Sequence, residues 1–310
     1  MNYLLYISYN LYIAYFLLRK TNFLLNLANT RRIVMNILIT DIENSLGNYL
    51  NSYLSTNNSV FGFTKDTLFL SDKSKTLDTI ANIKPDVVIH TASLENLDLC
   101  EKDEGLAYTY NTIGSLNAAY PCSLLDIPII YLSSSYVYDG EKPTSYYETD
   151  DCYPVNIFGK TKLASEKLIR TLCRKYFIIR TSWVFGGDDC FIQSVLENKT
   201  AEVFMCTQEI GNPTNIHDIC FAIEKLLKSD LYGIYNCASP DHVSKFDWIS
   251  YIFKVKNIKK ELIAIPKDII NSVAPRPKNA SLNTSMLKNC FDLELPHWKV
   301  STKEYLNKLP

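Results

Sequence analysis

The segment from Met35 to Leu54 has residue types and spacing that could bind a phosphate-containing ligand. A short apolar strand leads into a turn and then a helix, and the turn reads Asp41-Ile42-Glu43-Asn44-Ser45-Leu46-Gly47. A helix that starts in this position offers unpaired backbone N–H groups and the positive end of its dipole. The pyrophosphate of a dinucleotide rests at such a helix start, so the segment indicates a dinucleotide site.

Two segments further along the chain bring hydroxyl and basic side chains to a second group of positions. Residues 131–140 (YLSSSYVYDG) end a strand, and residues 156–167 (NIFGKTKLASEK) lie on a helix. Phe158 and Lys162 are four residues apart, so they share one face of that helix.

These segments belong to a regular alternation of strands and helices that begins at Met35. Strands are expected at 35–40, 60–64, 87–90, 129–133 and 177–180, and helices at 46–54, 76–83, 106–125 and 156–174. The strands are short and apolar, as expected when helices cover both faces of a parallel sheet. The pattern therefore predicts an α/β fold with a doubly wound parallel sheet, whose ligands bind beyond the carboxyl ends of the strands.

The regularity weakens after Gly186-Gly187, and a smaller cap is expected over residues 186–310. In this half we expect helices at 217–227, 245–253 and 302–309 and a strand at 234–237. The predicted strand returns to the sheet, so the division at residue 185 separates two parts that share elements.

Residues 1–34 form an apolar extension with three interpretations. Residues 2–18 are almost entirely apolar or aromatic, and Arg19-Lys20 and Arg31-Arg32 follow them. The positive charge comes after the apolar run, whereas a secretory signal has it before. The run is at the lower length limit for a membrane span, and an anchor here would hold the main domain in the cytoplasm. The alternatives are a docked helix or a miscalled start, with Met35 as the true first residue.

Composition excludes several classes of protein. Hydrophobic residues make up 47 % and charged residues 21 %, which excludes disorder, collagen and coiled coil. The net charge of −1 gives no field that would attract nucleic acid. Nine scattered cysteines without a CxxC pair, and four histidines without metal spacing, predict free buried thiols in a reducing cytoplasm and no metal site. Only 10 of the 310 residues are glycine, which is less than half of the usual frequency of about 7 %.

Taken together, the segments resemble the extended short-chain dehydrogenase/reductases, and within them the dTDP-4-dehydrorhamnose reductase family and the related regulatory β subunit of methionine adenosyltransferase. Further matching strings follow in the family's order: residues 84–92 (KPDVVIHTA), 180–186 (RTSWVFG), 210–214 (IGNPT), 276–283 (RPKNASLN) and 295–298 (LPHW). The resemblance implies an NAD(P)-binding domain over residues 35–185 and a substrate-binding cap over residues 186–310.

The resemblance implies reduction of a 4-keto-6-deoxy sugar nucleotide by NADPH or NADH. Ser134 stands where the family holds the ketone oxygen, and Lys162 where it orients the nicotinamide ribose. The family's proton-donating tyrosine is Phe158 here, which has no hydroxyl. General acid assistance contributes about 10²–10⁴ in rate. Tyr136 and Tyr153 lie nearby in sequence, although neither keeps the four-residue spacing to Lys162.

The family's Gly-x-x-Gly-x-x-Gly loop is also altered, because its three positions are Asp41, Asn44 and Gly47. Gly47 keeps the position needed for close helix packing, and Asp and Asn are good helix N-caps. A carboxylate about 4 Å from a pyrophosphate would be repelled by roughly 4 kcal/mol at an effective dielectric of 20. The predicted cofactor contacts are Asp41, Asn44, Ser45, Leu46, Gly47, Lys65, Asp72, Thr91, Ala92, Ser93 and Lys162.

Several of these positions have a second interpretation. Lys65 could meet an adenosine 2′-phosphate or be a solvated lysine, and Asp72 could approach the adenine. Thr91, Ala92 and Ser93 suit either a cofactor passing close to the backbone or ordinary packing.

Trp183, Asn212 and Arg276, together with Ser134, match the family's sugar-nucleotide cleft. The forked guanidinium of Arg276 suits a diphosphate, and a surface ion pair is its alternative.

Magnesium is implied by the family alone. Three functions follow: a cytoplasmic reductase, a pseudo-enzyme that binds a sugar nucleotide or a protein partner and regulates an assembly, or an active reductase whose acid is relocated. A homodimer is a further option.

Overall fold

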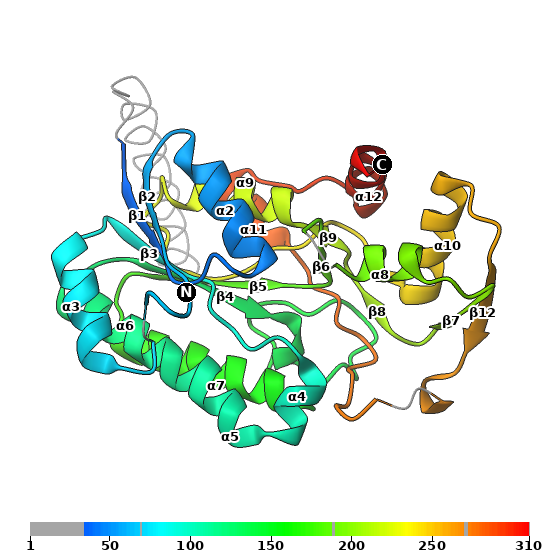
Figure 1. Cartoon of the computed structure of the whole chain (residues 1–310), viewed down its shortest axis with the longest axis horizontal. Helices are drawn as coiled ribbons and strands as arrows, with labels where there is room; N and C mark the ends of the chain where they lie inside the picture. The colour runs from blue at the N-terminus through cyan, green and yellow to red at the C-terminus, as the bar shows by residue number, and fades with distance from the viewer. Residues whose placement is uncertain (1–33, 69, 188–189, 270–271, 310) are drawn as a thin grey trace, which may run out of the picture. The chain divides into compact units, whose positions relative to one another are not determined.

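The computed structural model describes residues 34–309 except 69, 188–189 and 270–271. The predictions for residues 1–33 lie outside this range. A six-stranded sheet forms the centre, with the order β10-β5-β4-β3-β1-β2 and every pair parallel (Figure 1). Its strands are β1 (Asn36–Ile39), β2 (Ser59–Gly62), β3 (Val87–His90), β4 (Ile129–Ser134), β5 (Tyr176–Thr181) and β10 (Gly233–Asn236). The predicted α/β fold with a parallel sheet is confirmed.

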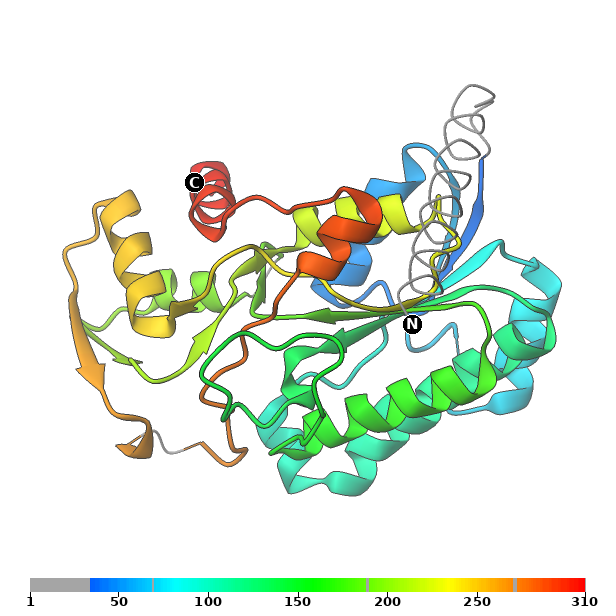
Figure 2. The same ribbon diagram turned by 180° about the vertical axis from the view of Figure 1, so that it is seen from behind.

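Both faces of the sheet are buried because successive side chains of each strand point to opposite sides. In β1, Ile37 and Ile39 belong to one core cluster and Leu38 to the other. The first face packs on α2 (Ser45–Ser55), α9 (Ile216–Leu226) and α11 (Ser285–Phe291), and the second on α3 (Lys73–Ile83), α6 (Gly114–Leu124) and α7 (Ile157–Leu172) (Figures 1 and 2). These two layers explain the continuously apolar strands of the sequence.

The strand order reverses between β1 and β3. The chain passes from β1 to β2 on one side and then returns to place β3 on the other side of β1. Ligands of open α/β sheets bind at such a reversal, beyond the carboxyl ends of the strands. The loops that follow β1 and β3 begin at Thr40 and Thr91, which puts both loops at this crevice.

The second half of the chain adds strands and helices beside the sheet. Its elements are β6 (Val184–Phe185), α8 (Phe191–Glu197), β7 (Glu202–Cys206), β8 (Ile210–Gly211), β9 (Thr214–Asn215), β11 (Val243–Ser244), α10 (Lys245–Lys256), β12 (Glu261–Ile265) and α12 (Trp298–Lys308). They share an aromatic core that includes Phe185, Trp248 and Trp298. Three of its elements, β10, α9 and α11, belong to the sheet or pack on it. The second half of the chain therefore contributes to the sheet domain as well as to the cap.

The expected helix over 106–125 is different in the structure. It consists of α5 (Glu104–Ala107), a six-residue π-helix (Tyr108–Ile113) and α6. In the π-helix the Asn111 side chain accepts a hydrogen bond from the Leu94 backbone N–H at 2.6 Å and donates to Thr161 Oγ1 at 2.9 Å. These contacts hold the widened turn, and local sequence does not reveal them. Helix α4 (Leu97–Lys102), capped by Asn96, was not predicted.

A buried ion pair joins β5, α7 and β4. Arg180 on β5 donates to both carboxylate oxygens of Glu166 on α7, at 2.9 and 2.6 Å, and the two side chains are only 3 % and 1 % exposed. Ser133 at the end of β4 donates to the same carboxylate at 2.5 Å. The guanidinium also donates to the Tyr138 hydroxyl at 2.6 Å.

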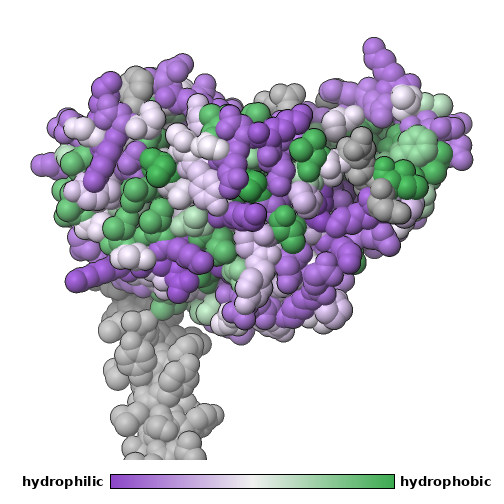
Figure 3. All heavy atoms as spheres, turned by 90° about the horizontal axis from the view of Figure 1, so that it is seen from below, coloured by the Kyte–Doolittle hydropathy of each residue, from purple (hydrophilic) through white to green (hydrophobic). Residues whose placement is uncertain are grey.

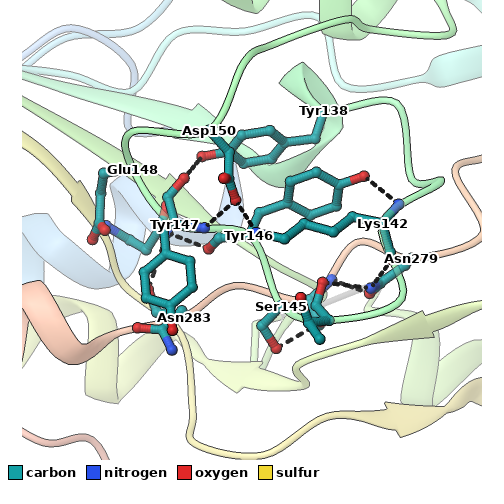
Figure 4. A network of polar contacts seen from close by, with 12 residues as sticks. Tyr138, Lys142, Ser145, Tyr146, Tyr147, Glu148, Asp150, Asn279 and Asn283 are labelled. Atoms are coloured by element: carbon teal, nitrogen blue, oxygen red, sulfur yellow. Dashed lines mark hydrogen bonds and ion pairs between the residues drawn. The ribbon is translucent and has the colours of Figure 1, made fainter.

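Tyr138 connects this ion pair to the loop between β4 and α7. Figure 4 shows its ring beside that of Tyr146, with the ring centres 4.3 Å apart. The Lys142 ammonium reaches Asp150 at 2.5 Å, and Asn279 donates to the backbone carbonyl of Lys142 at 2.8 Å. The loop is therefore tied to the C-terminal segment as well as to the sheet.

We expect Arg180→Met to reduce the free energy of unfolding by about 3–5 kcal/mol, because it leaves the Glu166 carboxylate buried without its partner. Urea denaturation followed by circular dichroism measures this loss. Lys278→Met is the control, since Lys278 pairs with Glu141 at 3.2 Å with both side chains more than half exposed. The control should lose about 1 kcal/mol or less. An equal loss in both variants would contradict the role given to the buried pair.

Candidate active site

Ser134, Phe158 and Lys162 are brought together at the carboxyl edge of the sheet. Ser134 ends β4, while Phe158 and Lys162 lie in the first turns of α7, which begins where the Asn156 side chain accepts from the Gly159 N–H at 2.8 Å. The helix approaches the strand end closely, because a Cβ on Gly159 would lie 2.0 Å from the Tyr136 carbonyl oxygen.

Lys162 is 4 % exposed and faces the loop after β3. Its Nζ lies 3.4 Å from Ser93 Oγ, 4.7 Å from the centre of the Tyr131 ring and 5.8 Å from the centre of the Phe158 ring. The shared helix face expected for Phe158 and Lys162 is confirmed. An ammonium held in this way can donate hydrogen bonds into the crevice.

Phe158 is packed as an apolar residue. It is 8 % exposed and belongs to a cluster with Cys100, Ala107 and Ile157. The ring of Tyr136 meets it edge to face, with ring centres 6.2 Å apart. Burial raises the pKa of Tyr136 to about 12, the charge of Glu209 adds to this rise and that of Arg276 opposes it, so the hydroxyl keeps its proton at neutral pH.

The turn between β1 and α2 uses its own side chains to bind its backbone. Asp41 is 1 % exposed, and its carboxylate accepts from the Glu43 N–H at 2.8 Å. Asn44 caps α2 by accepting from the Gly47 N–H at 2.8 Å, as predicted for an N-cap. The Asp41 carboxylate therefore points into the turn rather than toward solvent.

The predicted packing role of Gly47 is confirmed. A Cβ at this position would lie 1.9 Å from the backbone oxygen of Asp41 and 3.2 Å from Thr91 Oγ1. The neighbouring residues are also packed: Leu46 lies against the first core cluster, and Ser45 faces Gly187, where a Cβ would come within 2.2 Å.

The loop after β3 is fixed to both neighbouring strands and helices. The Thr91 hydroxyl donates to the Asp41 carbonyl at 2.7 Å, and the Ala92 N–H donates to Thr40 Oγ1 at 3.2 Å. Ser93 donates to Asn111 Oδ1 at 3.3 Å. Sequence reasoning missed Asn111, which lies inside the helix predicted over 106–125. The three small residues thus have packing roles, and a cofactor contact stays a prediction for them.

His90 lies beneath this loop in a fully buried position. Its ring nitrogens lie 2.9 Å from Thr40 Oγ1 and 2.9 Å from Ser115 Oγ. Burial lowers the pKa of His90 to about 3, assisted by the charge of Lys162, so the ring is neutral. His90 is therefore a core histidine whose two ring nitrogens are both hydrogen-bonded.

Three charged residues, Lys65, Asp72 and Glu95, lie in the segments that follow β2 and β3. Glu95 is exposed in part, and the protein atoms around its carboxyl raise the pKa of that group. The charges of Lys162 and Lys65 oppose this rise, whereas the charge of Asp41 adds to it. Lys65 is exposed, and Asp72 caps α3 by accepting from the Ser74 and Lys75 N–H groups at 3.0 and 3.1 Å. Asp72 therefore has a structural role, and its approach to adenine stays a prediction.

Trp183 holds a strained backbone position on the substrate side, with φ at +40°. Its ring stacks on Trp248, with centres 6.0 Å apart, and covers Gly211, where a Cβ would lie 2.4 Å from the ring. The Lys245 ammonium lies 5.6 Å from the ring centre and pairs with the buried Glu209. Sequence reasoning did not find the Lys245–Glu209 pair.

Asn212 and Arg276 are bound to other parts of the chain. Asn212 is 1 % exposed; its amide donates to the Ser239 and Asp241 carbonyls and accepts from the Leu282 N–H. Its side chain therefore supports the wall of the cleft and has little surface for a ligand. Arg276 forms an ion pair with Asp98 at 3.0 Å, as in the second of its two interpretations from the sequence. Its binding of a diphosphate stays a prediction.

Among the described residues, the remaining cavity, surface and cysteine features mark no second site. A surface cavity of about 570 Å³ lies between α8 and β7, away from Ser134 and Lys162. Figure 3 shows hydrophobic residues near β7 and β12, where Phe204 is 52 % exposed. Within the part of the chain that the structure describes, no group of His, Cys, Asp and Glu could hold a metal, and no helix is long and apolar enough to cross a membrane. All nine cysteines are free.

The six-stranded parallel sheet, with helices on both faces and its strand reversal between β1 and β3, is that of a Rossmann-type fold. The family described as RmlD substrate binding domain matches residues 35–310, and the chain belongs to this family. The recognition made from the sequence is confirmed.

Relatives and solved structures agree with this assignment. The dTDP-4-dehydrorhamnose reductase of Aggregatibacter actinomycetemcomitans is 29 % identical, with 86 % of this chain and 97 % of the relative covered. The spore coat polysaccharide biosynthesis protein SpsK of Bacillus subtilis is 27 % identical, covering 80 % and 88 %. A dTDP-4-dehydrorhamnose reductase structure from Bacillus anthracis, in complex with NADP, has a TM-score of 0.86 at 29 % identity and covers 89 % of this chain and 100 % of that chain.

We expect Gly47→Ala to destabilise the protein strongly, because the new methyl group would meet backbone that cannot move aside. The expected loss is about 3 kcal/mol or more in urea denaturation. Gly105→Ala is the matched control in a helix, since its Cβ would meet only Asp103 Oδ1 at 3.6 Å, and it should be neutral or slightly stabilising. A tolerated Gly47→Ala would refute the close approach.

Proposed function

We propose that this chain reduces the ketone of a dTDP-linked 4-keto-6-deoxy sugar with NADPH, as a dTDP-4-dehydrorhamnose reductase with weakened proton delivery. The observation that carries the proposal is the position of Lys162, almost buried and directed at Ser93 beside the end of β4. The relatives that share this fold over most of their length support the same substrate class.

The two ends of the crevice fit a dinucleotide unequally. At one end, Lys162 would hold the nicotinamide ribose and the small residues Thr91, Ala92 and Ser93 would let the cofactor pass. At the other end, Asp41 and Asn44 already accept two backbone N–H groups of the turn. The fit therefore holds for the nicotinamide half, and we expect the pyrophosphate half to bind weakly. When bound, the cofactor would supply a hydride.

Ser134 would hold the ketone oxygen of the substrate. Its Oγ accepts from the Tyr136 N–H at 3.2 Å, which leaves its hydroxyl hydrogen to be donated to that oxygen. A fixed donor aimed at a developing negative charge stabilises the transition state. Phe158 cannot supply the proton that the reduced oxygen needs, and a loss of about 10²–10⁴ in rate is the expected consequence.

A second candidate function is a nucleotide-sugar-binding or regulatory subunit without chemistry, acting as a homodimer or with another protein. The self-bonded turn between β1 and α2 favours it, because the same turn would have to bind the pyrophosphate. Six buried and unpaired thiols agree with a reducing, cytoplasmic location for either function.

We expect Asp41→Gly combined with Asn44→Gly to tighten NADPH binding by about tenfold or more, because it frees two N–H donors and removes a carboxylate. Calorimetric titration of the purified protein measures the Kd. Asp103→Gly is the control, since it removes a capping carboxylate from α5, where Asp103 accepts from the Leu106 N–H. If neither the original protein nor the double variant bound NADPH, the reductase proposal would fail and the binding function would remain.

Phe158→Tyr should raise kcat for NADPH-dependent reduction of dTDP-4-dehydrorhamnose by about tenfold or more, because it restores a hydroxyl four residues before Lys162. Steady-state NADPH oxidation is the measurement. Phe158→Leu, which restores no hydroxyl, should stay at the original rate or below it. Equal rates for the original protein and Phe158→Tyr would show that proton delivery is not weakened.

A further inference from the structure

Tyr136 lies between the groups that define the candidate site. It follows Ser134 by two residues in a 3₁₀ turn (Ser135–Val137) and donates its backbone N–H to Ser134 Oγ. Its ring meets Phe158 edge to face at 6.2 Å between centres. The ring of Tyr136 is therefore a direct neighbour of the side chain at position 158.

The backbone of Tyr136 is fixed against α7. A Cβ on Gly159 would lie 2.0 Å from the Tyr136 carbonyl oxygen, so the helix start and the 3₁₀ turn are in direct contact. The charges of Glu209 and Arg276 both act on the hydroxyl. Tyr136 is therefore fixed beside both Ser134 and the start of α7, and its side chain is only partly buried.

The other tyrosines near the site are engaged or directed elsewhere. Tyr131 is 1 % exposed, and its hydroxyl is enclosed without a hydrogen-bond partner, so solvent and substrate do not reach it. Tyr138 donates to the Tyr147 carbonyl and accepts from Arg180, and Tyr146 donates to Asp139 at 2.5 Å. Tyr153, the alternative left open by the sequence, is 64 % exposed.

We propose that Tyr136 supplies the proton that Phe158 cannot, directly or through one water molecule. This inference rests on the proposed function. In the step, the carbonyl carbon of the sugar receives the hydride from NADPH and the π electron pair of the C=O bond moves to oxygen. That oxygen takes the proton of the Tyr136 O–H, and the resulting tyrosinate is reprotonated by water. NADPH becomes NADP⁺, so atoms and electrons balance.

We expect proton transfer from the Tyr136 hydroxyl to be slower than proton transfer from a tyrosine at position 158. A hydroxyl with a pKa of about 12 is protonated throughout the neutral range but is a weak acid. Lys162 approaches Phe158 and Tyr131, and no contact between its ammonium and Tyr136 helps to lower that pKa. Reduced activity, rather than full activity, is therefore the expected result of this arrangement.

A double-mutant cycle on the full chain tests the inference. Single-turnover NADPH oxidation with dTDP-4-dehydrorhamnose is measured for the original protein, Tyr136→Phe, Phe158→Tyr and the double variant. Tyr136→Phe should lower the rate by at least about tenfold in the original protein and by less than about threefold beside Phe158→Tyr. Calorimetric binding of dTDP-rhamnose should stay within about threefold in all four proteins, which separates proton delivery from substrate binding. Tyr153→Phe is the control and should not change the rate.

Each other outcome overturns the inference. An equal loss from Tyr136→Phe in both backgrounds would assign Tyr136 a structural or binding role. An active Phe158→Tyr beside an inactive original protein would show that Tyr136 delivers no proton, while the ancestral reductase site is intact. Inactivity of all four proteins would reject the proposed function together with the inference.

Discussion

The candidate site depends on two opposite charges buried beneath it. Glu166 lies one turn beyond Lys162 on α7, and Arg180 comes from the neighbouring strand β5. The same carboxylate accepts from Ser133, the residue before Ser134. Helix α7 cannot slide along the sheet without separating these groups, and a buried charge without its partner is strongly unfavourable. The relative placement of Ser134 and Lys162 is therefore set by an interaction that touches neither.

The same fold treats its two ligand regions differently. Near Ser93, the Lys162 ammonium makes a weak contact of 3.4 Å to the Ser93 hydroxyl, which leaves its N–H groups able to donate to a ligand. In the turn after β1, side chains complete the hydrogen bonds of the backbone. The region around Lys162 therefore keeps hydrogen-bond donors for a ligand, whereas side chains of the turn after β1 already accept the N–H groups that a ligand would use. This contrast is what makes slow reduction and ligand binding without chemistry the two competing functions.

Much of the fold could be predicted because it follows from local pattern. Val87–His90 is a strand with four buried residues, and the Gly47 position demands the smallest residue. The parts that could not be predicted depend on distant partners. The π-helix is held by Asn111 through Leu94 and Thr161, and Arg276 meets Asp98 from 178 residues away. Sequence could name Phe158 as the missing hydroxyl, but only packing could favour Tyr136 over Tyr153.

The backbone at Trp183 presents a conflict between conformation and side chain. Its φ of +40° is one that glycine adopts freely and that costs an aromatic residue on the order of 1–3 kcal/mol. Glycine there would relax the chain but would remove the ring that covers Gly211 and meets Lys245. The fold is thus locally frustrated at a wall of the cleft, and such conflicts are expected where a ligand, rather than folding, dictates the residue.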